Sequence, residues 1–196
     1  MISSGLATAE VSAVVTSDHK LIAVAQLGDE KAFSALFEQN KDAVYAFALR
    51  TIGSREDAED IVQETFCRAW RSLASFRGDS RLLTWLFKIA ANLCVDHMRS
   101  SRRRAWTATE ASIDPEAFEA SRSSEPESFA KQAVKDALNI LPPSHKMLVI
   151  LCDIQGFTCE EAAKIVGCSS ISVRVRLSRA RKKLRTLLSD VLEGVY

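Results

Sequence analysis

Apolar residues recur at intervals of three and four along two long stretches of the chain, about residues 20–104 and 129–190. This spacing places them on one side of a helix, and the strict alternation of a half-buried strand persists nowhere. Glycine and proline are scarce, at 7 and 4 of 196 residues, so few tight turns are available. The sequence therefore predicts an all-α protein made of two small helical domains.

The two helical stretches are separated by residues 105–128, which are rich in Ser, Glu, Ala and Pro and show no sustained periodicity. That composition is typical of a flexible acidic linker. We therefore expect an N-terminal extension (1–19), a first domain (20–104), the linker, a second domain (129–190) and a C-terminal tail (191–196).

Composition and the N-terminal residues limit the class of protein. No apolar run approaches the roughly 20 residues that a membrane-spanning helix needs, and residues 1–20 lack the basic start and compact apolar core of a signal peptide. We therefore expect a cytoplasmic protein without membrane insertion. The formal net charge is only +1, yet residues 164–189 hold eight basic residues and no acidic one.

The five cysteines, at positions 67, 94, 152, 159 and 168, form no CxxC pair and are odd in number. They are predicted to be small, buried hydrophobic residues of a protein in a reducing compartment. Cys94 and His97 lie one helical turn apart, but a metal site would need a second pair of ligands. The sequence therefore predicts neither a metal nor another cofactor.

A first amphipathic helix is expected to begin after Ser54, whose side chain can cap it. Its apolar stripe consists of Val62, Phe66, Ala69 and Leu73. Acidic side chains gather on the opposite side, at Asp57, Asp60 and Glu64. They could form a solvated surface, bind a metal as helical carboxylate sites do, or dock on a basic partner protein.

A second helix is expected over about residues 84–99. Its core side consists of Leu82, Leu86, Ile89 and Leu93, and another sector gathers Trp85, Lys88, Asn92 and Arg99. An aromatic ring, cations and an amide suit single-stranded nucleic acid, although Trp85 could equally pack against the preceding segment. The basic residues that follow favour nucleic acid; they are Arg102, Arg103 and Arg104.

The third pattern is that of a helix-turn-helix. Thr158 and Glu161 predict a capping box, Gly167 ends the short helix, and Ser169 or Ser170 caps the next one. The second helix has an apolar stripe of Val173, Leu177, Ala180, Leu184 and Leu187. Its opposite side carries Val175, Ser178, Arg179 and Lys182, flanked by Arg174 and Arg176. A basic second helix predicts entry into the major groove of DNA.

A helix-turn-helix alone is common, but three particular blocks of sequence in a fixed order are a specific signal of a protein family. They are DAEDIVQETFCRAW, then FRGDSRLLTWLFKIAANLCVDHMR, then LPPSHKMLVILCDIQGFTCEEAAKIVGCSSISVRVRLSRARKKL. The chain resembles the extracytoplasmic-function (ECF) group of bacterial sigma-70-type sigma factors over about residues 20–104 and 129–188. It departs from the family's frequent Gly-Thr-Val at the start of the recognition helix, where it has Ile171-Ser172-Val173.

The resemblance implies a function for each block. The first domain would bind the β′ clamp helices of core RNA polymerase through Asp57, Asp60, Gln63 and Glu64. It would also melt the promoter −10 element and hold its single strand through Trp85, Lys88, Asn92, Arg99, Arg102 and Arg103. The second domain would bind the β flap and read the −35 duplex through Ser170, Ser172, Arg174, Val175, Arg176, Ser178, Arg179 and Lys182.

The family also implies an anti-sigma partner and a stress-related role, and it implies that the chain is not an enzyme. Two rival interpretations follow from the residues. A two-domain transcription regulator would explain the helix-turn-helix but not the side chains around Asn92. A metal-dependent hydrolase would need more ligands than His19, His97 and His145 can supply.

Overall fold

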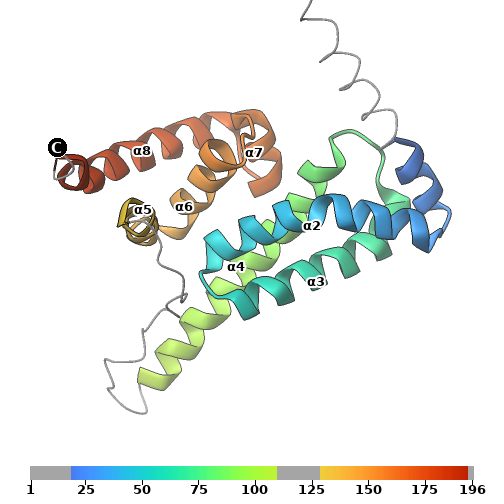
Figure 1. Ribbon diagram of the computed structural model, residues 1–196, viewed down its shortest axis with the longest axis horizontal. Coiled ribbons are helices and arrows are strands. Elements are labelled where there is room, and N and C mark those ends of the chain that lie inside the picture. Colours follow the sequence, from blue (N-terminus) through green and yellow to red (C-terminus); the bar gives the residue numbers. More distant parts are fainter. Residues whose placement is uncertain (1–18, 110–128, 194–196) are drawn as a thin grey trace, which may run out of the picture.

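The structure is a computed structural model that describes residues 19–109 and 129–193, and every regular element in these ranges is helical (Figure 1). The all-α prediction is thus confirmed for the described part of the chain. Residues 19–26 form a first helical segment. The elements that follow are α2 (Glu30–Ile52), α3 (Arg55–Ser72), η1 (Leu73–Ser75), α4 (Leu82–Thr109), α5 (Phe129–Asn139), α6 (Pro143–Val149), η2 (Ile150–Ile154), α7 (Cys159–Val166) and α8 (Ser170–Glu193).

Short polar side chains and glycines fix the helix ends. Ser54 accepts a hydrogen bond from the Asp57 amide at 3.3 Å at the start of α3. Thr158 and Glu161 form the predicted capping box of α7, and Gly167 ends that helix with a φ of 70°. These local predictions are confirmed, because each depends only on residues within one turn.

The buried side of α3 and α4 differs from the predicted stripes. Val62 of α3 is only half-buried, whereas Ala58, Ile61 and Thr65 are buried. In α4 the buried residues are Thr84, Leu86, Phe87, Ala90, Ala91 and Cys94, while Leu82, Ile89 and Leu93 are half-buried. The reason is that α4 packs against α2, α3 and α7 together, so small residues lie where the helices approach closely.

The α4 helix continues to Thr109, five residues beyond the expected domain boundary at residue 104. Its C-terminal turns extend away from the other helices (Figure 1). Residues 105–109 are therefore helical rather than part of a linker. The rest of the predicted linker, 110–128, lies outside the described residues, as do 1–18 and 194–196.

The two domains touch, which the sequence does not predict. Helix α7 packs on α4, and η2 and α6 contact α2. The rings of Phe87 in α4 and Phe157 before α7 lie 4.9 Å apart between centroids, and buried residues of both domains form one continuous cluster. Phe157 itself is half-buried.

The cysteines only partly follow the prediction. Cys94 is fully buried, and burial raises the pKa of its thiol to about 12. Cys67 is exposed, and the other three are half-buried. Among the described residues, no group of three or more His, Cys, Asp or Glu side chains is placed to hold a metal ion. No helix in 19–109 or 129–193 combines the length and apolarity needed to cross a bilayer.

Replacing Phe157 tests the contact between the domains. Phe157→Ala should reduce the free energy of unfolding by about 1–2 kcal/mol, less than a fully buried phenylalanine would cost, because the ring is half-buried. The radius of gyration from small-angle X-ray scattering should increase as the domains separate. Val134→Ala, at an exposed apolar residue of α5, which packs on α8 of its own domain, is the control and should change neither quantity. An unchanged radius for Phe157→Ala would show that this ring does not hold the domains together.

Candidate functional site

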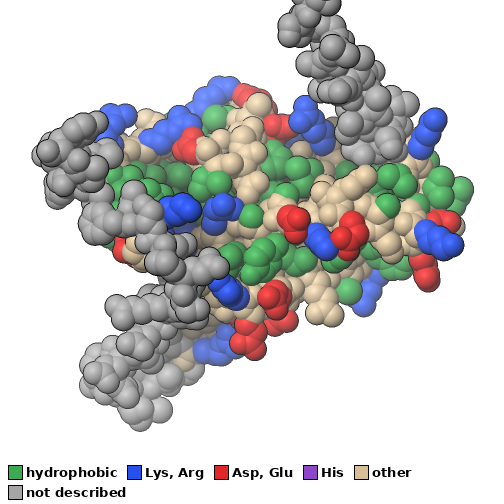
Figure 2. All heavy atoms as spheres, in the orientation of Figure 1, with side chains coloured by type: hydrophobic (Ala, Val, Ile, Leu, Met, Phe, Trp, Pro, Cys, Tyr) green, Lys and Arg blue, Asp and Glu red, His purple; other side chains and the backbone are tan. Residues whose placement is uncertain are grey.

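The outer surface of α8 lies opposite its buried stripe. Val173, Leu177 and Ala180 are buried against α6 and α7, as predicted. The side facing away from them carries exposed residues, namely Ile171, Val175, Ser178, Arg179 and Lys182, with Arg176 beside them. Basic side chains gather along this part of the surface (Figure 2). Sequence reasoning missed Ile171, although it lies one helical turn before Val175 and the same spacing would have found it.

Two of the α8 arginines bind acidic residues of other elements. Arg174 forms a hydrogen-bonded ion pair with Glu160 of α7. Arg181 binds both carboxylate oxygens of Asp153 in η2, at 3.2 and 2.5 Å. Acidic residues distant in sequence thus neutralise part of the positive charge of the eight basic residues between 164 and 189.

The Arg181–Asp153 pair lies beside a pair of thiols. The Cys152 thiol contacts that of Cys159, and burial raises its pKa to about 11. The hydrogen bonds that Arg181 donates to the Asp153 carboxylate likewise raise the pKa of Arg181. Cys152 therefore remains protonated at neutral pH. The two hydrogen bonds from Arg181 to Asp153 tie α8 to η2.

The N-terminal turn of α8 is stabilised by Ser169. Its hydroxyl accepts a hydrogen bond from the Ser172 amide at 3.2 Å and donates one to the Ser172 hydroxyl at 3.0 Å. Ser169 rather than Ser170 is thus the cap. The Ser170 and Ser172 side chains, both predicted to contact DNA, are half-buried.

A second polar surface follows the outer side of α4. Lys88, Asn92 and Arg99 are exposed, as their sector of the helix predicts. Asp96 lies on the same side and pairs with Arg99 at 4.0 Å. Trp85 is half-buried, and its ring packs on that of Phe76 with 5.2 Å between centroids. Trp85 thus packs against the preceding segment, as one of the two interpretations expects, while part of its side chain remains exposed.

The basic residues after Arg99 continue on helix α4. Arg103 and Arg104 are exposed, whereas the Arg102 side chain lies outside the described residues. Arg104 donates a hydrogen bond to the Ser101 hydroxyl at 3.2 Å. Because these turns are helical, the cations are carried on a rigid element rather than on a flexible segment.

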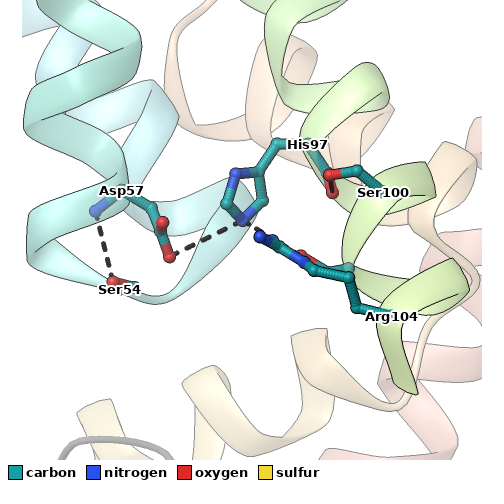
Figure 3. A network of polar contacts seen from close by, with 6 residues as sticks. Ser54, Asp57, His97, Ser100 and Arg104 are labelled. Carbon is teal, nitrogen blue, oxygen red and sulfur yellow. Dashed lines mark hydrogen bonds and ion pairs between the residues drawn. The ribbon is translucent and has the colours of Figure 1, made fainter. Parts of the chain in front are cut away.

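The predicted acidic residues of α3 do not share one role. Asp60 and Gln63 are exposed, and Glu64 binds Arg68 one turn later at 2.6 Å. Asp57 instead faces α4, where its carboxylate lies 3.6 Å from Nε2 of His97 (Figure 3). The Ser101 hydroxyl lies 3.3 Å from the same nitrogen. Asp57 therefore helps to fix α3 against α4.

An apolar groove of about 750 Å³ runs between α2 and α3. Phe33, Phe37, Val62, Phe66 and Trp70 line it, and Gln63 lies at its edge with Glu59. The ring of Trp70 contacts that of Phe33 at 4.8 Å and is 36% exposed. Hydrophobic side chains are visible among charged ones over α2 and α3 (Figure 2). Sequence reasoning missed this groove, because it needs apolar residues of two helices to face each other.

Comparison with known proteins identifies the family. Residues 36–104 match the family model for Sigma-70 region 2, and residues 131–184 match that for Sigma-70, region 4. The ECF RNA polymerase sigma-E factors of Salmonella typhimurium and Escherichia coli are both 34% identical over 177 residues, which is 86% of this chain and 92% of theirs. The chain belongs to the ECF RNA polymerase sigma factors. The ECF RNA polymerase sigma factor BldN of Streptomyces coelicolor is 35% identical over 87% of this sigma factor and 66% of BldN.

Solved structures of sigma factors have the same fold. The sigma factor RpoE of Bartonella quintana, in complex with the anti-sigma factor NepR, aligns with a TM-score of 0.66 and 34% identity over 81% of this chain and 98% of RpoE. CnrH, in complex with the cytosolic domain of CnrY, aligns with a TM-score of 0.64 and 29% identity over 88% of this chain and 97% of CnrH. Both alignments include most of this sigma factor.

The contrast between Asp57 and Asp60 can be tested by stability. Asp57→Asn should lower the free energy of unfolding by about 0.5–1 kcal/mol, because it removes a negative charge from the N-terminal turn of α3 and from the contact with His97. Asp60→Asn, at an exposed position one turn later, should change it by less than half as much. Urea unfolding of the two variants measures the difference, and equal effects would contradict the role assigned to Asp57.

Proposed function

We propose that this sigma factor binds core RNA polymerase, directs it to promoters by reading a −35 and a −10 element, and promotes melting of the −10 DNA. The observation that carries the proposal is the exposed basic surface on the second helix of a helix-turn-helix. The chain would supply base contacts to the polymerase and no catalytic group. Run-off transcription by core polymerase on a promoter library, with and without the chain, tests it.

The −35 element would be read by α8. In a helix-turn-helix, residues near the start of the second helix contact base edges in the major groove, and cations beside them bind phosphates. Arg176, Arg179 and Lys182 are exposed and suited to this task. The pairing of Arg174 with Glu160 would orient its guanidinium group before DNA arrives.

The −10 element would be held by α4. Capture of an unstacked base lowers the cost of melting, which is a few kcal/mol per flipped base. The exposed Asn92 amide can hydrogen-bond a base edge, and Lys88 can bind a phosphate of the same strand. Arg99, Arg102 and Arg103, further along the helix, would follow the backbone, while Trp85, supported by Phe76, would lie at the edge of the melted region.

Core polymerase would bind the groove between α2 and α3. The exposed Asp60 and Gln63 and the half-buried Glu64 lie on α3, and Gln63 continues their surface into the groove. An apolar floor with an acidic rim suits a helical segment that carries both apolar and basic residues. The β′ clamp helices are the proposed occupant, and the second domain would bind the β flap.

An anti-sigma factor is the remaining proposed partner. RpoE and CnrH, whose folds match over most of this chain, are seen in complex with the anti-sigma factor NepR and with the cytosolic domain of CnrY. A protein that binds this chain with its two domains in contact would stabilise that arrangement. We propose that the sigma factor acts in the cytoplasm, where both polymerase and promoter are present.

Trp70→Ala tests the groove. Removing the ring should weaken binding to core polymerase at least tenfold, as expected for an aromatic residue at the centre of an interface. Affinity can be measured by fluorescence anisotropy of the labelled chain with purified core polymerase. Leu27→Ala, at an apolar residue that is 89% exposed on another segment, is the matched control and should bind normally. Unchanged affinity for Trp70→Ala, with helicity retained, would place the polymerase contact elsewhere.

Arg179→Ala and Asn92→Ala separate the two DNA contacts. Arg179→Ala should weaken promoter binding by about 1–3 kcal/mol if it reads a base, because it acts on duplex DNA before melting. Asn92→Ala should leave this step nearly intact but slow open-complex formation and reduce −10 base preference. Filter binding and permanganate footprinting of the holoenzyme measure the two steps.

A template with a pre-melted −10 bubble and no −35 element provides the control. On it, Arg179→Ala should behave as the wild type, whereas Asn92→Ala should still lose base discrimination. If Arg179 were needed on the bubble and Asn92 were not, the assignment of the two domains would be wrong.

A further inference from the structure

Two large apolar side chains project from the outer surface of α8, which is proposed above to read the −35 element. Ile171 is 69% exposed and Val175 is 46% exposed. They are four residues apart, so they lie on the same side of the helix, one turn above the other. That side is opposite to the buried Val173, Leu177 and Ala180. Ile171 is mostly exposed and Val175 nearly half exposed, on the side of α8 away from the core, so packing alone does not explain why both are apolar.

Polar groups in the same turn of α8 are already engaged. The Ser172 hydroxyl accepts a hydrogen bond from Ser169, and the Arg174 guanidinium binds Glu160. Both contacts tie these side chains to the protein. Ile171 and Val175, by contrast, extend outward from the same part of α8 as apolar side chains that no such contact ties to the protein.

The surroundings of the apolar pair match the floor of a major groove. Arg176, Arg179 and Lys182 are exposed along the same helix, so the surface is suited to a polyanion. An apolar protein partner would offer these cations no negative charges to bind. In the major groove, by contrast, the C5-methyl group of thymine is the apolar feature that distinguishes one base from the others.

We propose that Ile171 and Val175 read thymine in the −35 duplex by packing against its C5-methyl group. The inference rests on the proposed function of α8 and adds to it the base that the apolar pair selects. Residues four apart are about 6 Å apart along the helix axis. Since successive bases rise about 3.4 Å, the pair spans at most about two base-pair steps, whatever the angle between α8 and the DNA axis. The preferred thymines should therefore lie within about two base pairs of each other.

The test removes single methyl groups from DNA and from the protein. The holoenzyme is first used to select binding sequences from duplexes randomised over the −35 region. Thymine should be enriched at one or two neighbouring positions, on either strand. Each selected thymine is then replaced by deoxyuridine, which keeps the base pair and removes only the methyl group. Wild-type holoenzyme should bind roughly fourfold more weakly for each methyl lost.

The protein variants complete the cycle. Ile171→Ala should bind the thymine and deoxyuridine duplexes equally well at one of these positions, and Val175→Ala should do so at the other. Arg179→Ala is the matched control on the same surface, because it should bind more weakly while keeping the full deoxyuridine effect. Ile140→Ala, at an apolar residue 55% exposed outside α8, should behave as the wild type throughout.

The outcomes are distinguishable. Absence of any thymine preference in the selected duplexes would overturn the inference and leave the proposed function intact. The same holds if Ile171→Ala and Val175→Ala both keep the wild-type sensitivity to deoxyuridine. If the wild-type holoenzyme selects no sequence at all in the −35 region, the proposed function of α8 is wrong and thymine reading is overturned with it. Both positions are exposed, so circular dichroism should show unchanged folding.

Discussion

Close packing around α4 is the constraint on which the rest of the structure depends. Ala90, Ala91 and Cys94 line its buried side, and their small size lets α2, α3 and α7 approach one helix from different directions. The residues left outside that contact, Lys88 and Asn92 among them, are therefore held on a rigid support. A larger residue at Ala90 or Ala91 would displace a neighbouring helix rather than a single side chain, since helices already touch there.

Local signals in the sequence were sufficient for the helix ends and for most of α8. Ser54, Thr158 and Gly167 act through hydrogen bonds or dihedral angles within one turn. A helical wheel alone places Val173 and Ser178 on opposite sides of α8, without any knowledge of neighbouring helices. The buried sides of α3 and α4 were harder to predict. A wheel shows which residues share a side, but several helices packed on α4 decide that Ala90 is buried more deeply than Leu93.

The parts of the site that escaped prediction are those formed between elements. Pairing of Arg174 with Glu160 and of Arg181 with Asp153 joins residues 14 and 28 positions apart. The groove beside Gln63 needs Phe33 from α2 opposite Phe66 from α3. The sequence groups Asp57 with Asp60, yet only Asp57 lies close to His97 of α4, so the two carboxylates have different roles. Distance in sequence, rather than any unusual chemistry, limited these predictions.

If the two domains separate, the packed and separated forms are two populations of the same molecule, and the contacts between the domains, Phe87 with Phe157 among them, set their ratio. Any partner that needs the domains apart binds only the separated fraction, so its observed dissociation constant increases by the inverse of that fraction. Each tenfold excess of packed over separated molecules thus makes the binding free energy of such a partner less favourable by about 1.4 kcal/mol. A partner that binds the packed form meets no such penalty. The packing between the domains, which includes these two rings, can in this way set the threshold at which competing partners exchange, without contacting either of them.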